Sequence, residues 1–153
     1  MDKNVIIQVW KDWLWKSQWN EIINQGYTVL LSACWYINYI EYGETWRKYY
    51  ECDPIATTGV PQSQWSQILG GEAAIWGEYV DQTNIVPRLF PFTGAVASVL
   101  WDSNIGDGSG RENTDDAMHR LDAFRCNLLR RGVRAQPIIN SYCGPFELTV
   151  ELK

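Results

Sequence analysis

Three short apolar runs, spaced apart by stretches of different pattern, constrain the fold of this chain most strongly. Residues 5–10 (VIIQVW), 27–33 (YTVLLSA) and 68–76 (ILGGEAAIW) have the length of strands, and we expect the first two to be buried on both faces. Between those two, SQWNEIIN has helical spacing, with Ser17 as the N-cap and Gly26 as the stop. This alternation predicts an α/β fold of parallel strands joined by helical crossovers.

The rest of the chain contains further helical patterns. A short helical piece is expected near residues 45–50 and a longer helix over 89–101, whose start Pro91 can shift. The glycine-rich GDGSG at 106–110 is expected to be a flexible loop.

The last helix has the clearest pattern. Asn113 can cap its start and Gly132 its end. His119 lies off the apolar stripe, so we expect an ordinary surface residue. Four residues form the stripe: Ala117, Leu121, Phe124 and Leu128.

The size of the chain permits one domain with a core. It has 153 residues, of which 46% are hydrophobic and 20% charged, which is typical of globular proteins. A doubly wound sheet usually has more than three strands, and a complete (β/α)₈ barrel needs about 250 residues. We therefore expect either a small α/β domain or a piece of something larger.

Composition argues against several function classes. The formal net charge is −5, and no run of Lys and Arg is interleaved with aromatic residues, so nucleic-acid binding is not expected. The basic RRGVR at 130–134 follows a helix, where cations complement the helix dipole. No segment reaches the roughly 18 apolar residues of a membrane span.

The cysteine pattern does not predict a metal centre. The four cysteines form no CxxC pair, and His119 is the only histidine, so we expect no metal and no cofactor. Cys126 and Cys143 could close a short loop and stabilise the fold by roughly 3 kcal/mol. From composition alone, two reduced thiols fit equally well.

Aromatic residues recur where the predicted strands end. Trp10, the pair at 35–36 and Trp76 hold these positions, and ligands of parallel α/β folds bind at the carboxyl ends of strands. An indole face beside a carboxylate suits a sugar ring. Glu78 would share a face with Trp76, and Glu72 would lie deeper on that face. The alternative to a binding site is that the strand ends carry aromatic residues without a function and that Glu78 is a solvated loop residue.

Other catalytic patterns are weak. The chain has no G-x-S-x-G elbow, and a single histidine leaves almost no candidate for Ser–His–Asp chemistry. No strand precedes GDGSG and no Lys follows it, so it does not match a phosphate loop. Asp115 and Asp116 lie in a first helical turn, where acidic residues favour the dipole.

Four longer segments carry a specific resemblance. IIQVW, LLSACWYINYIEYGETW, GGEAAIWGEYVDQTNIVPRLFP and FRCNLLRRGVRAQP together resemble the C-terminal part of animal β-N-acetylhexosaminidases, in the same order and over about residues 5–146. These belong to glycoside hydrolase family 20, which includes the lysosomal hexosaminidase α and β chains. The resemblance implies a partial (β/α)₈ TIM barrel. Residues 1–153 would be the C-terminal portion of the catalytic barrel domain, an incomplete domain with about the last three βα units and a C-terminal helix.

The resemblance also implies roles for individual residues. Trp10 and Trp76 match the walls of the pocket around a terminal N-acetylhexosamine, and Tyr36 matches a residue that hydrogen-bonds its acetamido group. Glu78 matches a residue that holds the outer hydroxyls of the sugar, and Asn38 one that faces its 6-position.

Further features follow from the same resemblance. Tyr42 matches a residue that reaches the neighbouring subunit's site in the dimeric animal enzymes, so the full-length enzyme is expected to be a dimer. Cys126 and Cys143 match a family disulfide, which favours an oxidising compartment, lysosomal or secreted. The roles of Glu72, Cys34 and Cys52 stay open.

The mechanism of the family is substrate-assisted and retaining. The acetamido oxygen attacks the anomeric carbon, a Glu acts as general acid and the preceding Asp orients the acetamido group. We find no match for this Asp–Glu pair in the chain and so predict no catalytic residue here. The parent enzyme would remove terminal GlcNAc or GalNAc from glycoconjugates or chitin oligomers, whereas the chain alone would be inactive. The alternatives are a non-catalytic sugar-binding remnant and a truncated gene product.

Overall fold

The computed structural model of the chain describes residues 2–102 and 113–144. The loop expected at 106–110 lies outside these residues. Among the described residues, no helix has both the length and the apolar character needed to cross a membrane.

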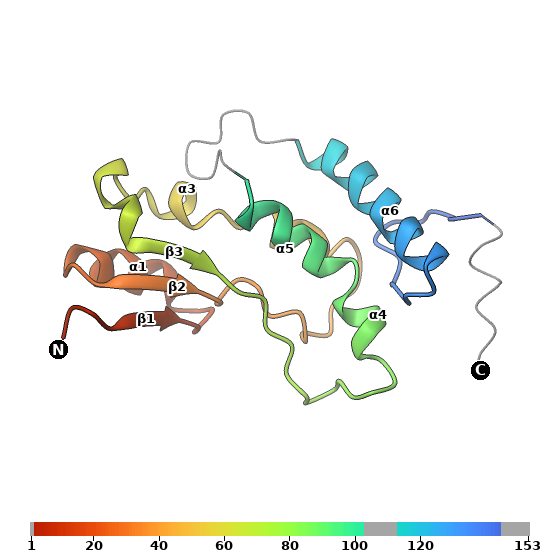
Figure 1. The fold of residues 1–153 in the computed structure, drawn as a ribbon, viewed down its shortest axis with the longest axis horizontal. Helices are drawn as coiled ribbons and strands as arrows, with labels where there is room; N and C mark the ends of the chain where they lie inside the picture. The colour runs from red at the N-terminus through yellow and green to blue at the C-terminus, as the bar shows by residue number, and fades with distance from the viewer. Residues whose placement is uncertain (1, 103–112, 145–153) are drawn as a thin grey trace.

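A small parallel sheet forms one end of the structure (Figure 1). Its strands are β1 (Ile6–Val9), β2 (Thr28–Leu31) and β3 (Ile68–Gly71), in the spatial order β1-β2-β3. β1 pairs with β2 in continuous register, and the pairing of β2 with β3 is irregular between Val29 and Leu31. The predicted α/β class with parallel strands is therefore confirmed.

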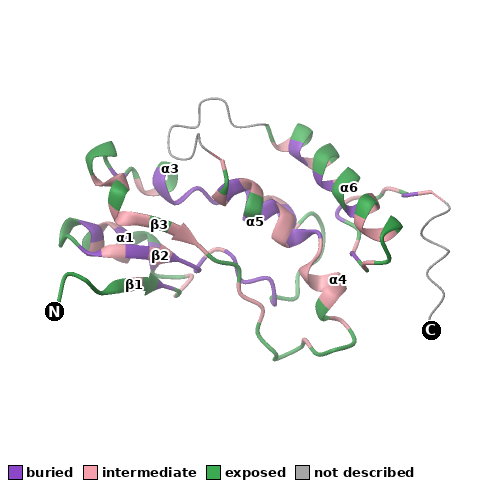
Figure 2. Cartoon of the chain, viewed as in Figure 1, coloured by how far each residue is buried: buried purple, intermediate pink, exposed green. Residues whose placement is uncertain are grey.

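The two predicted buried strands differ in environment. β2 is central, and Val29 and Leu31 are fully buried, although its other two residues are half-buried. β1 is an edge strand, where Val9 is buried but Ile6 is 55% exposed. The prediction that both faces of β1 are buried is thus wrong: two of its four residues, Ile6 and Gln8, are exposed, and the strand is mostly green in Figure 2.

Helix α1 (Trp15–Asn24) connects β1 and β2. Its side chains at i, i+4 and i+8, Trp15, Trp19 and Ile23, are buried. Ser17 does not cap the helix as predicted, because the helix begins earlier and the Ser17 hydroxyl donates to the carbonyl oxygen of Leu14 at 2.9 Å. The helix ends before Gly26, whose φ of 79° fits the predicted stop.

Three short helices link β2 to β3. These are α2 (Trp46–Glu51), which the sequence predicted, α3 (Pro54–Thr58) and a 3₁₀ helix, η1 (Gln62–Gln67). The Asp53 carboxylate caps α3 by accepting from the backbone N–H groups of Ile55 and Ala56, both at 2.9 Å. A five-residue helix is too short to show periodicity, so only the Asp-Pro pair could have predicted it.

The helix expected over 89–101 is two helices. α4 (Ile85–Leu89) ends before a cis Phe90–Pro91 peptide bond, and α5 (Phe92–Leu100) begins directly after it. Pro91 has no backbone N–H and cannot continue α4. α5 packs against both α2 and α6 (Thr114–Arg130).

Helix α6 follows its predicted pattern in part. Asn113 caps it by accepting from the N–H groups of Asp115 and Asp116, each at 3.0 Å, and His119 is exposed as predicted. The prediction of a buried apolar stripe is wrong at Phe124, which is exposed, whereas the neighbouring Arg125 is buried. The other stripe positions are buried at Ala117 and Leu121 and half-buried at Leu128.

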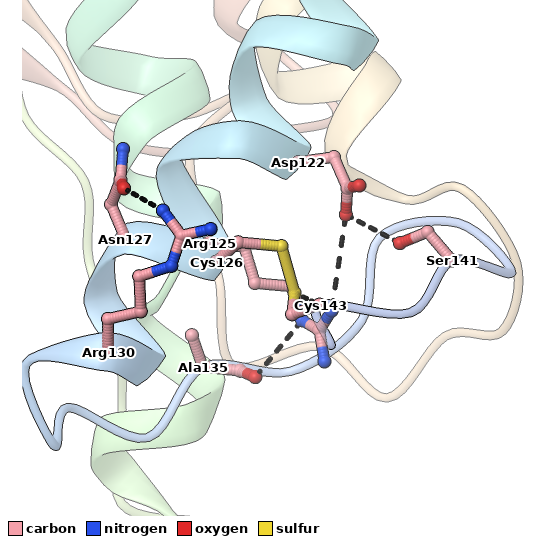
Figure 3. The surroundings of a disulfide bond; sticks show 8 residues. All are labelled: Asp122, Arg125, Cys126, Asn127, Arg130, Ala135, Ser141 and Cys143. Atoms are coloured by element: carbon pink, nitrogen blue, oxygen red, sulfur yellow. Dashed lines mark hydrogen bonds and ion pairs between the residues drawn. A yellow bond between two sulfur atoms is a disulfide. The ribbon is translucent and has the colours of Figure 1, made fainter. Parts of the chain in front are cut away.

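The disulfide Cys126–Cys143, which the resemblance implied, is present and ties α6 to the segment after it (Figure 3). The buried Arg125 guanidinium lies beside it, with Nη1 2.9 Å from the Cys143 sulfur and Nε 3.4 Å from the Ala135 carbonyl oxygen. Asp122 lies 4.0 Å from that Nη1 atom. A second disulfide, Cys34–Cys52, joins the end of β2 to the end of α2.

Candidate ligand-binding site

A cavity of about 310 Å³ lies beyond the carboxyl ends of the strands. All of the residues predicted to bind substrate line it, and their roles stay predictions. Asp12, Trp13 and Tyr39, which the sequence did not single out, line it too. The predicted set is Trp10, Tyr36, Asn38, Trp76 and Glu78.

The backbone brings these residues together in two ways. Trp10 directly follows β1. Tyr36 and Trp76 lie well past the ends of β2 and β3, but an isolated parallel bridge pairs Tyr36 with Ala74. In that bridge the Ile37 N–H donates to the Ala74 carbonyl oxygen at 2.8 Å. This bridge, rather than the strand end expected from the sequence, places Tyr36 beside the turn that carries Trp76.

The polar centre of the cavity is the pair Asn38 and Glu78. The Asn38 side-chain amide donates to the Glu78 carboxylate at 3.1 Å. Asn38 is 8% exposed, and its side-chain oxygen has no hydrogen-bond partner among the described residues. An unpaired buried acceptor is costly, and the described residues supply no donor for this oxygen.

A second polar pair closes one side of the cavity. The Tyr39 hydroxyl donates to the Asp12 carboxylate at 2.8 Å, and this hydrogen bond, with burial and the nearby charge, raises the pKa of Tyr39 to about 12. Burial also raises the pKa of Tyr36, although a hydrogen bond with Trp76 opposes the shift. Both phenols are therefore protonated at neutral pH; the Tyr39 hydroxyl donates to Asp12, and the Tyr36 hydroxyl can donate to a bound molecule.

A layer of buried groups supports the wall formed by residues 35–39. The Tyr49 hydroxyl donates to the Tyr36 carbonyl oxygen at 3.1 Å, and the Trp35 indole donates to the Tyr49 carbonyl oxygen at 3.0 Å. One Arg88 nitrogen donates to the carbonyl oxygens of Asn38 and Tyr39, at 3.1 and 3.2 Å. These contacts hold the backbone of residues 35–39 from behind.

The two indoles at the mouth of the cavity stay open to solvent. Trp10 is 50% exposed and Trp76 is 59% exposed, so each has free ring surface for stacking. The cavity therefore combines aromatic surfaces with hydrogen-bonding groups. No group of three or more His, Cys, Asp or Glu residues in the described part of the chain could hold a metal ion.

Two residues of interest lie outside the cavity lining. Glu72, expected to lie deeper than Glu78, is exposed; its carboxylate accepts a hydrogen bond from the Gln8 amide, which supplies the partner that the sequence did not reveal. Tyr42 is 96% exposed, and its predicted contact with a second subunit stays a prediction.

The additional lining residues had a sequence signal. Asp12 and Trp13 follow Trp10 within three residues, and Tyr39 follows Asn38 directly. They belong to the same segments that leave β1 and β2, so a wider window around each strand end would have found them.

Comparison with known proteins identifies the family. The model of "Glycosyl hydrolase family 20, catalytic domain" matches residues 1–104, and the chain belongs to this family. It is 46% identical over 143 residues to the beta-hexosaminidase subunit alpha of Rattus norvegicus, covering 92% of this chain and 26% of that protein. It is 43% identical over 139 residues to the beta-hexosaminidase subunit beta of Homo sapiens, covering 91% of this chain and 24% of that protein. The chain thus spans about a quarter of the length of these relatives.

Solved structures agree on the fold. The GH20 exo beta-N-acetylglucosaminidase from Vibrio harveyi, solved with N-acetylglucosamine, matches with a TM-score of 0.71 at 20% identity, over 90% of this chain and 23% of that one. A chitobiase from Flavobacterium johnsoniae matches with a TM-score of 0.70 at 25% identity, over 86% of this chain and 20% of that one. The resemblance seen in the sequence is therefore confirmed.

Proposed function

We propose that this chain is part of an exo-β-N-acetylhexosaminidase, in which it forms one wall of the pocket for a terminal N-acetylhexosamine. The observation that carries the proposal is the convergence of three strand-end segments on one cavity of about 310 Å³. Membership of glycosyl hydrolase family 20 supports it. In the full enzyme, β1, β2 and β3 would be the last three strands of a (β/α)₈ barrel.

Each group in the cavity fits one part of the sugar. The indoles of Trp10 and Trp76 would stack on its apolar C–H surface. The Tyr36 hydroxyl would donate to the acetamido oxygen. The Glu78 carboxylate would accept hydrogen bonds from the outer hydroxyls of the sugar, because a charged acceptor forms strong hydrogen bonds. Asn38 would face the 6-position of the sugar.

The chemical step would use the substrate's own acetamido oxygen as nucleophile. That oxygen forms a bond to the anomeric carbon as the glycosidic bond breaks, and a general acid protonates the departing oxygen. Water then opens the cyclic intermediate, so the anomeric configuration is retained. Tyr36 would help to orient the acetamido group. The general-acid Glu that protonates the departing oxygen, and the Asp before it that also orients the acetamido group, would lie outside this chain.

The proposed function also implies a substrate class, a cellular compartment and an oligomeric state. The substrate would be a glycan ending in GlcNAc or GalNAc. Two disulfides suit an oxidising compartment, lysosomal or secreted. The exposed Tyr42 would contact a second subunit in a dimer of the full-length enzyme.

Sugar binding can be measured on the chain itself. We expect GlcNAc to produce a saturable change in tryptophan fluorescence at millimolar concentration, because three indoles line the cavity. Trp76→Ala should weaken binding by at least about tenfold, since aromatic surface dominates such sites. Trp101→Ala is the matched control, because Trp101 is 89% exposed and lies outside the cavity. A wild-type chain that shows no saturable change would contradict the proposal.

A further inference from the structure

We infer that the disulfide Cys34–Cys52 is a positioning device for the sugar pocket, and not only a stabiliser of the fold. This inference rests on the proposed sugar-binding function. The bond encloses a loop with a sequence separation of 18. Within that loop lie three residues of the cavity wall: Tyr36, Asn38 and Tyr39.

The two cysteines anchor the loop at elements that are otherwise separate. Cys34 follows the end of β2 and stands two residues before Tyr36, and Cys52 directly follows α2. Their Cα atoms are 6.5 Å apart. The bond therefore fixes the end of α2 against the exit of β2.

Helix α2 in turn holds the wall from behind. It carries Tyr49, whose buried hydroxyl donates to the Tyr36 carbonyl oxygen at 3.1 Å. The Tyr49 carbonyl oxygen also accepts from the Trp35 indole at 3.0 Å. A shift of α2 away from β2 would break both contacts and release Tyr36, which would orient the acetamido group of the substrate.

The position of Cys34 supports the same conclusion. Cys34 lines a second cavity of about 290 Å³, which shares Asp12, Tyr36 and Tyr39 with the sugar cavity. The covalent bond thus lies behind the phenol groups that form the wall. A preorganised wall loses less conformational entropy when the sugar binds, and this raises affinity.

The other disulfide offers a matched comparison. Cys126–Cys143 has a sequence separation of 17, nearly the same as 18, so the loop-entropy model predicts similar effects of the two bonds on the unfolded chain. It ties α6 to the segment after it, and none of the residues it encloses lines the sugar cavity. Comparing the two disulfides therefore separates an effect on the stability of the fold from an effect on the position of the cavity wall.

The experiment compares the double variants C34S/C52S and C126S/C143S in the GlcNAc titration. We expect both to unfold at lower urea concentration, whereas only C34S/C52S should weaken GlcNAc binding, by about tenfold. Affinities are measured without denaturant, where near-UV circular dichroism shows native packing. If C34S/C52S does not fold, Cys34→Ala combined with Cys52→Val, which keeps the buried position apolar, replaces it.

Each outcome decides the matter. Unchanged affinity in the Cys34–Cys52 variants overturns the inference and leaves the sugar-binding function intact. Equal loss in both double variants overturns it as well, because general destabilisation would then explain the effect. A wild-type chain without GlcNAc binding overturns the proposed function, and the inference with it.

Discussion

At the scale of single residues, Asn38 shows how the cavity is prepared for a ligand. Its carbonyl oxygen accepts from Arg88, its side-chain nitrogen donates to Glu78, and its side-chain oxygen has no partner among the described residues. The first contact holds the backbone of Asn38 and the second fixes its side-chain amide, so the side-chain oxygen is left buried without a donor among the described residues. Sequence matching proposed this residue but could not reveal the unpaired oxygen, which depends on Glu78, 40 positions away.

The Asp12–Tyr39 pair predicts a specific pH response. Tyr39 has a pKa of about 12 in the folded chain against an ordinary value of 10.0, so folding favours the protonated phenol. The contribution of the Asp12–Tyr39 hydrogen bond to the free energy of unfolding is complete below pH 10 and is lost as the pH rises through about 12. Asp12→Asn should move the pKa of Tyr39 back toward 10.0, because the hydrogen bond to the carboxylate is its main cause.

The titration can be followed by the NMR signals of the tyrosine rings. Tyr39→Phe identifies the signal, because it removes only this phenol. The pKa of Tyr49, which burial also raises, serves as the internal reference. A pKa of Tyr39 that does not change in Asp12→Asn would contradict the assigned cause.

At the scale of elements, β3 depends on a glycine. A Cβ atom at Gly71 would lie 2.1 Å from the Trp35 ring and 2.5 Å from the Leu31 carbonyl oxygen. Both neighbours are fixed, because Trp35 and Leu31 are fully buried. The close approach of β3 to β2 therefore requires glycine at this position.

Gly71→Ala should lower the free energy of unfolding by about 1–3 kcal/mol, the usual effect of overpacking a fixed core. Gly77→Ala is the control, because the nearest atom to its Cβ would be 3.7 Å away. Urea unfolding followed by far-UV circular dichroism measures both variants. If the two variants are equally stable, the packing account of Gly71 is wrong.

Elements were predictable where the pattern is local. Apolar runs located all three strands, and Asn113 located the start of α6. Environment was less predictable: β1 has the same apolar composition as a buried strand, yet it lies at the edge of the sheet. Position in a sheet depends on the pairing order of strands, which composition does not contain.

At the scale of the whole molecule, the described part of the chain leaves one face of the sheet uncovered. Ile6 and Leu69 on the two edge strands are exposed, and exposed strand edges favour association with other strands. The chain spans about a quarter of the length of its relatives, and in the full-length enzyme that we propose, further strands would cover this face.

We therefore expect the chain by itself not to hydrolyse a chromogenic N-acetylglucosaminide, even with the GlcNAc binding that we propose for it. The physical reason is that a sugar held in position still needs a general acid to protonate the leaving group. The assay compares the purified wild-type chain with Trp76→Ala. Turnover that is present in the wild type and lost in the variant would contradict this expectation.

The sequence by itself determined the order of the strands, the family and five of the residues that meet in the cavity, because these depend on local periodicity and on position-by-position similarity. Only the tertiary structure decided how Tyr36 and Trp76 meet, through the Tyr36–Ala74 bridge, and that Cys34 pairs with Cys52. The same holds for the burial of Arg125. The first two features form only when β2, α2 and β3 pack together, and Arg125 is buried only when the segment after α6 folds back onto that helix.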